Sequence, residues 1–183
     1  MRRAAVFLDR DGTLNQDLPQ GVTSLEEFVP LPGAFAAVGR LTAAGWPVIL
    51  VTNQSGVSKG ITTQDVVDAT HERCRELAAE HGGRIDGVYY ATDLPGSGGE
   101  RRKPRPGMLM EAAHEHDLDL FRSYMIGDAG RDLLAGKAAG CTSLLVLTGK
   151  GERTRAETPW PADEHVFADL AAAVDWILAQ ETE

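Results

Sequence analysis

The stretch Val6-Phe7-Leu8-Asp9-Arg10-Asp11-Gly12-Thr13-Leu14-Asn15 decides the fold of this 183-residue chain. The apolar run from Ala4 to Leu8 has the length and the branched side chains of a buried parallel strand. It ends at two carboxylates, Asp9 and Asp11. Open α/β sheets bind ligands at the carboxyl ends of their strands, so both acids are placed where chemistry is expected.

The spacing of the two acids indicates a cation. Two carboxylates this close repel each other, and each resists ionisation unless a positive charge lies between them. Gly12 lets the chain turn and redirect Asp11 relative to Asp9. A hard ion that prefers oxygen ligands, such as Mg2+, suits the pair. A bare Asp-x-Asp is usually a strand followed by an Asx turn, but a strand followed by Asp-x-Asp-Gly-Thr is far rarer.

The bulk composition is that of an ordinary soluble domain, with 43% hydrophobic and 25% charged residues. We expect one domain over 1–183. The net charge of -9 argues against general binding to nucleic acid or to anionic membranes. No signal-peptide core or apolar run of ~18 residues is present, which predicts a cytoplasmic location with no membrane segment. Cys74 and Cys141 are expected to be reduced, buried thiols.

Apolar segments and helical patterns alternate along the chain. Strands are expected at 4–8, 47–51, 88–91, 124–126 and 143–147, and helices at 34–44, 62–81, 108–116, 128–140 and 169–177. This alternation predicts an α/β fold of three layers, a doubly wound parallel sheet between helices. On the second helix, we expect Val66, Ala69, Cys74 and Leu77 to face inward. Segments 16–31, 92–106 and 148–164 are expected to be loops, and the absence of a large insertion predicts little or no cap domain.

Polar clusters follow three further strands. Thr52-Asn53-Gln54-Ser55-Gly56 offers a hydroxyl and two amides, which can bind phosphoryl oxygens without adding charge. The dense basic run Arg101–Pro106 and the pattern Gly127-Asp128-x-x-x-Asp132 follow the next two. Each cluster alone could be a turn, a solvated loop or a helix cap. Their shared position at strand carboxyl ends favours one common site.

The order of these clusters resembles the four motifs of the haloacid dehalogenase superfamily of phosphotransferases. This resemblance implies that Asp9 is a nucleophile that takes up a phosphoryl group and that Asp11 is the general acid and base. It also implies catalytic roles for Thr52, whose hydroxyl would bind the phosphoryl group, and for Lys103, which would offset negative charge.

The same resemblance implies the metal site. Mg2+ would be held by Asp9, by the backbone carbonyl of Asp11 and by Asp128, with Asp132 supporting these ligands. Receiver domains of two-component signalling use similar ingredients, but their phosphorylated aspartate follows a later strand than the acidic pair. The order found here therefore disfavours a receiver-like phosphate-signalling domain.

Within the superfamily the chain resembles the D-glycero-D-manno-heptose 1,7-bisphosphate 7-phosphatases and histidinol-phosphate phosphatases. The resemblance rests on the segments 8–15, 51–56 and 102–108 and spans essentially the whole chain. It implies hydrolysis of the heptose 7-phosphate through an aspartyl-phosphate, with histidinol phosphate or another sugar phosphate as alternatives. The substrate-binding residues implied are Asn53, Gln54, Ser55, Lys59, Arg102 and Lys103.

One departure from this family concerns a loop. Typical members hold it with four zinc ligands, Cys-x-His and Cys-x-Cys. The corresponding positions here are Ala91, Asp93, Gly99 and Arg101, so we predict no zinc. A smaller departure is Ala129, where relatives often carry lysine.

The expected partner is a small phosphorylated metabolite rather than nucleic acid or a membrane, and we expect a monomer. An open site could admit a 3′-phosphorylated nucleic acid end, but the acidic surface disfavours it. A non-enzymatic phosphate binder would have no use for the general acid Asp11.

Overall fold

The computed structural model describes residues 2–159, 162 and 165–180. One parallel sheet in the order β3-β2-β1-β4-β5-β6 lies at its centre. Its strands are β1 (Val6–Leu8), β2 (Val48–Asn53), β3 (Gly87–Ala91), β4 (Tyr124–Gly127), β5 (Thr142–Val146) and β6 (Val166–Phe167). The helices are α1 (Ala34–Ala43), α2 (Gln64–Glu80), α3 (Gly107–Glu115), α4 (Gly130–Ala139), α5 (Gly151–Glu157) and α6 (Leu170–Gln180), with short 3-10 turns η1 (Leu25–Glu27) and η2 (Leu120–Arg122).

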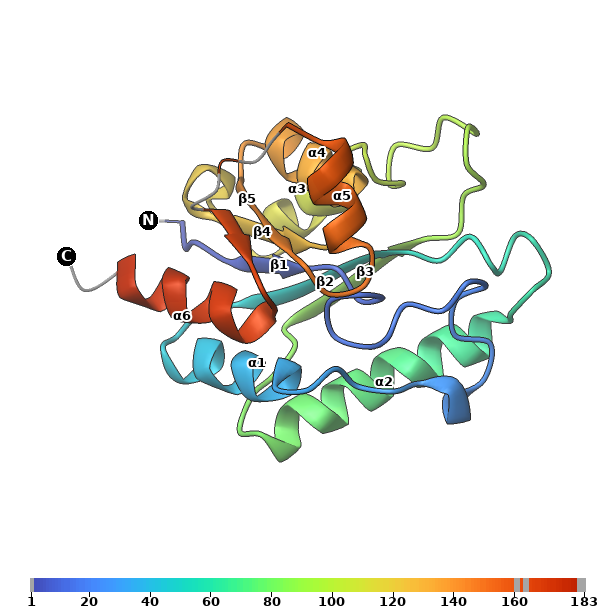
Figure 1. The fold of residues 1–183 in the computed structure, drawn as a ribbon, viewed down its shortest axis with the longest axis horizontal. Helices are drawn as coiled ribbons and strands as arrows, with labels where there is room; N and C mark the ends of the chain where they lie inside the picture. The colour runs from blue at the N-terminus through green and yellow to red at the C-terminus, as the bar shows by residue number, and fades with distance from the viewer. Residues whose placement is uncertain (1, 160–161, 163–164, 181–183) are drawn as a thin grey trace.

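The alternation of side chains along β1 builds the core on both faces of the sheet. Val6 and Leu8 pack in one apolar cluster with residues of α1, α2 and α6. Phe7 packs in a second cluster with residues of α3 and α4. Figure 1 shows these two helix layers on opposite sides of the sheet, with α5 beside α4. The predicted three-layer α/β fold with a doubly wound parallel sheet is confirmed.

The strand register brings the predicted clusters to one edge. Leu8 of β1 pairs with Leu50 of β2 on one side and with Ile126 of β4 on the other. The residues that follow these three positions therefore emerge at the same edge of the sheet, which is the carboxyl edge. The chain crosses from one side of β1 to the other between β3 and β4, and such a change of direction is where doubly wound sheets bind ligands.

The N-termini of α2 and α6 are capped as the sequence predicts, but the buried face of α2 differs from the prediction. The Thr63 hydroxyl accepts a hydrogen bond from the Val66 amide at 3.3 Å, and Asp169 caps α6 by accepting from the Ala172 amide at 2.9 Å. On α2, Ala69 is exposed, and the buried positions in its first half are Val67, Thr70 and His71. The prediction that Ala69 faces inward was wrong. The buried face of α2 includes two polar side chains, Thr70 and His71, which an apolar pattern does not detect.

Two predicted loops contain regular structure. Segment 148–164 holds α5, and β6 follows it and adds an edge strand, so the described sheet has one strand more than predicted. Positions 160–161 and 163–164 of that segment lie outside the described residues. Segment 16–31 contains η1 and buries Val22 and Phe28 in the core, so it is not merely a surface loop. No helix among the described residues is long and apolar enough to cross a membrane.

Candidate active site

Lys103 lies at the centre of the carboxyl edge and is fully enclosed. Its Nζ is 2.8 Å from Asp9 Oδ1, 2.8 Å from Asp132 Oδ1 and 2.8 Å from the carbonyl oxygen of Val51. The residue is only 1% exposed. Burial lowers the pKa of Lys103, but the charges of Asp132 and Asp9 raise it more, so the ammonium is retained.

The backbone of Lys103 is held in place by Asn53. The Asn53 side-chain nitrogen Nδ2 donates to the backbone carbonyl of Lys103 at 3.0 Å. The backbone N–H of Lys103 donates to Asn53 Oδ1 at 3.0 Å. Asn53 ends β2, so this pair of bonds ties the basic loop to the sheet. Asn53 therefore positions Lys103 as well as facing the cavity described below.

Three buried carboxylates gather beside Lys103. Ligand oxygens of Asp9, Asp128 and Asp132 lie within 4.8 Å of one another, and this is the one group of three metal-type side chains in the described part of the chain. Burial, followed by the charge of Asp132, raises the pKa of Asp9. Burial, followed by the charges of Asp9 and Asp132, raises the pKa of Asp128 to about 8. The cluster thus carries more negative charge than Lys103 alone offsets.

The surroundings of Asp128 fit a cation. Its Oδ1 is buried and has no hydrogen-bond partner among the described residues, whereas Oδ2 accepts from the Lys150 amide at 2.7 Å. A Cβ at Gly12 would lie 2.0 Å from Asp128 Oδ2, and Gly12 has φ +86°, so only glycine fits this approach. A free carboxylate oxygen among hard oxygen donors suits Mg2+.

Asp11 lies apart from this cluster and is held as an anion. Arg10 donates to Asp11 Oδ1 from Nε at 3.2 Å and from Nη2 at 3.0 Å, and also reaches Oδ2 at 3.0 Å. Asn15 and Gln54 each donate one further bond, at 2.9 and 3.0 Å. Burial raises the pKa of Asp11, but the Arg10 charge and these hydrogen bonds outweigh it, so the net pKa is lowered.

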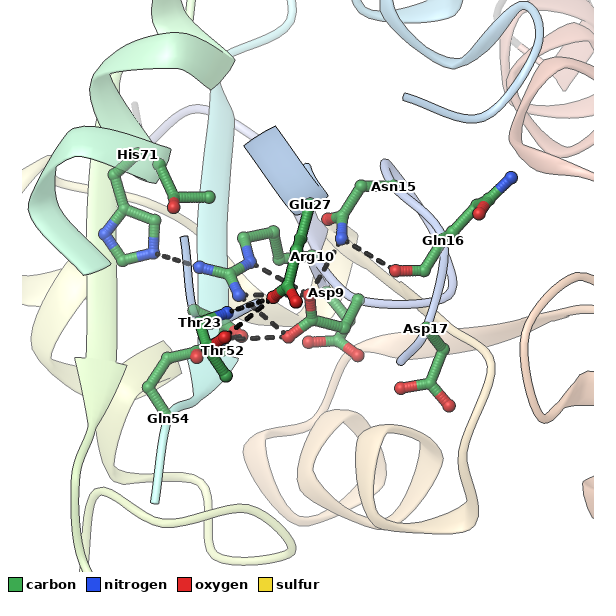
Figure 2. Close-up of polar contacts among 12 residues, drawn as sticks. Asp9, Arg10, Asn15, Gln16, Asp17, Thr23, Glu27, Thr52, Gln54 and His71 are labelled. Atoms are coloured by element: carbon green, nitrogen blue, oxygen red, sulfur yellow. Dashed lines mark hydrogen bonds and ion pairs between the residues drawn. The ribbon is translucent and has the colours of Figure 1, made fainter. Parts of the chain in front are cut away.

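The Arg10 side chain is held by His71 on the side away from Asp11. It is 1% exposed, and its Nη1 lies 3.4 Å from His71 Nε2 on α2. Figure 2 shows the guanidinium lying between the His71 ring and the carboxylates at the end of β1. Burial, followed by the positive charge of Arg10, lowers the pKa of His71 to about 3, so the imidazole is neutral and can accept from Arg10.

The polar residues that follow Thr52 border a cavity of about 200 Å³. Thr52 is 1% exposed, and its hydroxyl accepts from Gln54 Nε2 at 2.9 Å, so the hydroxyl proton remains available for donation. Of the predicted substrate-binding residues, Asn53, Gln54, Ser55 and Lys59 line the cavity together with Asp11. Arg102 and Lys103 do not line it.

Comparisons with known proteins agree with this geometry. A family model described as HAD-hydrolase-like matches residues 100–173. A D-glycero-beta-D-manno-heptose-1,7-bisphosphate 7-phosphatase of Pseudomonas aeruginosa is 40% identical over 178 residues, covering 97% of this chain and 99% of the relative. A D-glycero-D-manno-heptose-1,7-bisphosphate 7-phosphatase of Thermosynechococcus vestitus is 43% identical, covering 97% of this chain and 96% of that protein.

The chain belongs to the heptose 1,7-bisphosphate 7-phosphatase family.

A solved structure from this family supports the fold across the whole chain. The heptose bisphosphate phosphatase of B. bronchiseptica, crystallised with magnesium and phosphate, is 39% identical and superimposes with a TM-score of 0.92. The match covers 97% of this chain and 99% of that one. The resemblance drawn from the motifs is therefore confirmed, and the chain is a phosphatase of the haloacid dehalogenase type.

In this family member, arginines hold the loop where zinc ligands were missing from the sequence. Arg102 Nη1 donates to the Asp93 carbonyl at 2.9 Å, and Arg105 Nη1 donates to the Gly98 carbonyl at 2.7 Å. Arg105 also pairs with Glu100, and Arg101 Nε lies 2.9 Å from Glu111 Oε2 on α3. Three of the four zinc-ligand positions, Asp93, Gly99 and Arg101, thus belong to a loop held by guanidinium contacts, and the fourth, Ala91, ends β3.

Three further charged residues of this phosphatase line the cavity and were not among the predicted site residues. They are Asp17, Lys150 and Arg131. Arg131 lies inside the Gly-Asp-x-x-x-Asp pattern, where the motif leaves its position open. Its place on the first turn of the helix after β4 would have put it at the carboxyl edge of the sheet, and that signal was available in the sequence.

Proposed function

We propose that this protein removes the 7-phosphate of D-glycero-D-manno-heptose 1,7-bisphosphate through an aspartyl-phosphate on Asp9, with Mg2+ as cofactor. The observation that carries the chemistry is the buried pairing of Asp9 with Lys103 beside a carboxylate cluster that needs a cation. The substrate is drawn from the relatives, which carry the names of phosphatases for this sugar, in either anomer.

In the first step an Asp9 oxygen attacks the phosphorus, and the bond from phosphorus to the sugar oxygen breaks. Lys103 Nζ, 2.8 Å from Asp9 Oδ1, offsets charge on the nucleophile and on the phosphoryl oxygens. The Thr52 hydroxyl donates its free proton to one phosphoryl oxygen. Asp11 supplies the proton that the departing sugar alkoxide needs.

In the second step Asp11 takes a proton from water, and the resulting hydroxide attacks the phosphorus of the aspartyl-phosphate. The phosphorus bond to Asp9 breaks, which releases phosphate and restores the nucleophile. The Arg10 contacts keep Asp11 in the anionic form that this step uses. To act as the acid in the first step, Asp11 must instead carry a proton, which requires it to move away from Arg10.

The cation has a defined place in this proposal. Asp9, Asp128 and the backbone carbonyl of Asp11 would hold Mg2+, and Asp132 would support them through Lys103 and through the Ala129 amide, from which it accepts at 3.0 Å. When bound, Mg2+ neutralises charge on the phosphoryl oxygens. Hydrolysis of phosphate monoesters needs rate enhancements of up to ~10^21, so positioning and charge stabilisation act together.

The test is phosphate release with Mg2+ from a substrate panel. The panel contains both anomers of heptose 1,7-bisphosphate, histidinol phosphate, fructose 1,6-bisphosphate and a 3′-phosphorylated oligonucleotide. We expect a kcat/KM at least about a hundredfold higher for one heptose anomer, a difference of about 2.7 kcal/mol in transition-state binding. Comparable, low rates on all compounds would contradict the proposed substrate and leave another sugar phosphate as the candidate.

A further inference from the structure

His71 is a buried histidine that the two steps proposed above do not use. It belongs to α2, is 3% exposed, and its Nε2 lies 3.4 Å from Arg10 Nη1. In the described part of the chain this is the one hydrogen-bond partner of Nη1, whereas Nε and Nη2 of Arg10 both reach Asp11. The guanidinium thus contacts a carboxylate through one part and an imidazole through another, and Figure 2 shows the contact with His71.

The His71 ring is suited to accept a hydrogen bond from a cation. Burial, followed by the positive charge of Arg10, lowers its pKa to about 3, with Arg75 acting in the same direction and Asp11 in the opposite one. The ring is therefore neutral, and a neutral ring that accepts at Nε2 carries its proton on Nδ1. A protonated ring would instead place a second cation against Arg10.

The ring is also fixed in its place between α2 and the sheet. The centroids of the His71 and Tyr90 rings are 5.2 Å apart, and Tyr90 belongs to β3. The Tyr90 hydroxyl donates to Asp68 Oδ1 of α2 at 3.2 Å. These contacts hold Nε2 of His71 toward the guanidinium without any contribution from Asp11.

Arg10 needs such a contact because of what the acid step requires of Asp11. Arg10 is 1% exposed, and Asp11 is its one ion-pair partner in the described part of the chain. When Asp11 moves away to protonate the sugar oxygen, a buried guanidinium loses that partner, which is costly unless another acceptor remains. The contact with His71, at 3.4 Å, is longer than those with Asp11 at 3.0 and 3.2 Å, so a small shift of the guanidinium toward His71 would shorten it.

We propose that His71 is a positioning residue for the proton transfers: it holds Arg10 in place while Asp11 moves between Arg10 and the leaving group. The inference rests on the proposed function for the role of Asp11. His71 does not line the cavity that Asp11 borders, so it acts through Arg10 and not on the substrate.

The test compares two aryl phosphates of similar size whose leaving groups differ in their need for a proton. p-Nitrophenolate departs readily as an anion, whereas phenolate is a poorer leaving group and gains more from a general acid. The constant kcat/KM reports the steps up to the loss of this group, which separates the first proton transfer from the hydrolysis of the aspartyl-phosphate. In His71→Leu, which has no acceptor, we expect kcat/KM to fall about tenfold for phenyl phosphate and by no more than about twofold for p-nitrophenyl phosphate.

His71→Gln is the rescue variant, because its side-chain oxygen can accept from Arg10 and it keeps a polar group at this position should His71→Leu not fold. We expect its kcat/KM to fall only about threefold for phenyl phosphate and to stay unchanged for p-nitrophenyl phosphate. Tyr90→Phe is the matched control, since it keeps the ring beside His71 and removes only the hydroxyl, and it should leave both constants unchanged. The inference is overturned if either folded His71 variant loses the two activities equally or loses neither, or if His71→Gln loses as much as His71→Leu.

The aryl substrates separate this inference from the proposed function. If heptose bisphosphate proves a poor substrate but the His71 variants discriminate between the aryl phosphates as expected, the proposed substrate fails and the inference stands. If heptose bisphosphate is hydrolysed well and the His71 variants do not discriminate, the proposed function stands and the inference fails. Equal losses on both aryl phosphates in Asp11→Asn, or no release from either by the unaltered enzyme, would contradict the general-acid role of Asp11 and the inference with it.

Discussion

At Asp9, burial and the neighbouring Asp132 carboxylate oppose ionisation, whereas Lys103 favours it. The ion pair with Lys103 at 2.8 Å therefore favours the ionised nucleophile, although burial and Asp132 leave the pKa of Asp9 raised. Asp11 has the opposite balance, because Arg10 and two amides hold its pKa down. Two acids two residues apart thus receive different environments, which is how one strand end can provide both a nucleophile and a proton carrier.

Replacing the nucleophile tests this division of roles. Asp9→Asn keeps the shape of the side chain but removes the attacking oxygen anion, and we expect kcat to fall by more than ~10^3. The measurement is phosphate release at saturating substrate, with circular dichroism to verify that the variant is folded. Near-normal turnover by a folded Asp9→Asn variant would rule out the covalent route.

His71 predicts a pH-dependent loss of stability. Its pKa is lowered to about 3 by burial and then by Arg10, against about 6.5 for an unfolded histidine. The unfolded chain takes up a proton below pH 6.5 and the folded chain does not, so the contribution of neutral His71 is complete above pH 6.5 and is lost as the pH falls toward 3. At pH 5 the loss amounts to about 2 kcal/mol.

The measurement is urea unfolding of the unaltered protein and of His71→Gln at pH 7 and pH 5. Glutamine does not titrate, so the difference between the two pH values should shrink by about 2 kcal/mol in the variant. Equal pH dependence in both proteins would show that His71 takes up a proton in the folded state.

At the residue scale, the sequence identified the motif positions but not the residues next to them in the motifs, such as Arg131. Asp9, Thr52 and Asp128 stand at strand ends and Lys103 in the loop after β3, all with recognisable chemistry, and the structure brings them to one edge. Arg131 was left unassigned because its motif leaves its position open and an arginine on a helix is usually a solvated residue. Its Nε is buried without a hydrogen-bond partner among the described residues, and its charge faces carboxylates of the cluster, which only the folded chain shows.

At the scale of elements, the loop between β3 and α3 decides where Lys103 lies. Asn53 anchors it on one side, and the contacts of Arg102 and Arg105 hold its backbone on the other. The sequence showed that zinc ligands were missing but not what took their place. Guanidinium bonds to backbone carbonyls leave no spacing pattern, since they depend on the conformation of the loop itself.

The residue that follows this loop, Gly107, is packed against the loop backbone, which predicts that Gly107→Ala lowers both activity and stability. A Cβ at Gly107 would lie 2.3 Å from the backbone oxygen of Glu100, so the loop backbone must move. Because Lys103 lies between these two residues, we expect kcat to fall by about tenfold and stability to fall by roughly 1–3 kcal/mol, the usual cost of overpacking. Gly130→Ala is the control, since the nearest atom to its Cβ would be Thr158 Oγ1 at 3.9 Å. Steady-state kinetics and urea unfolding of both variants measure the two effects. Equal kcat and equal stability of Gly107→Ala and Gly130→Ala would contradict the steric argument.

The elements missed by sequence reasoning are those with the least apolar periodicity. Helix α5 reads Gly-Glu-Arg-Thr-Arg-Ala-Glu, and it docks through a bond from the Thr154 hydroxyl to the Asp128 carbonyl at 2.8 Å. Strand β6 is two residues long. Such short, polar elements are stabilised by tertiary contacts and leave little pattern in the sequence. Buried strands such as Val48–Asn53 are recognisable from their run of apolar residues.

At the scale of the whole molecule, three buried carboxylates, Asp9, Asp128 and Asp132, gather at the carboxyl edge of the sheet. Burial, then Asp9 and Asp132, raise the pKa of Asp128 to about 8, against about 3.9 in the unfolded chain. Without metal, the folded chain therefore binds a proton that the unfolded chain has released. The stability linked to this proton is complete below pH 3.9 and is lost as the pH rises through 8, at about 1.4 kcal/mol per pH unit.

Magnesium should reverse this trend, which makes the metal site measurable without any substrate. We expect the Tm in EDTA to fall between pH 6.5, above which the contribution of His71 is constant, and pH 8. Mg2+ binds the deprotonated carboxylates, so its stabilisation, about 2.7 kcal/mol at a hundredfold excess over Kd, should grow over the same range. Asp128→Asn removes one titrating ligand and should flatten the EDTA profile and abolish the Mg2+ shift. A Tm that Mg2+ leaves unchanged at both pH values would mean that the cluster holds its charge through Lys103 and Arg131 alone, and that the cation is not bound until the phosphorylated substrate arrives.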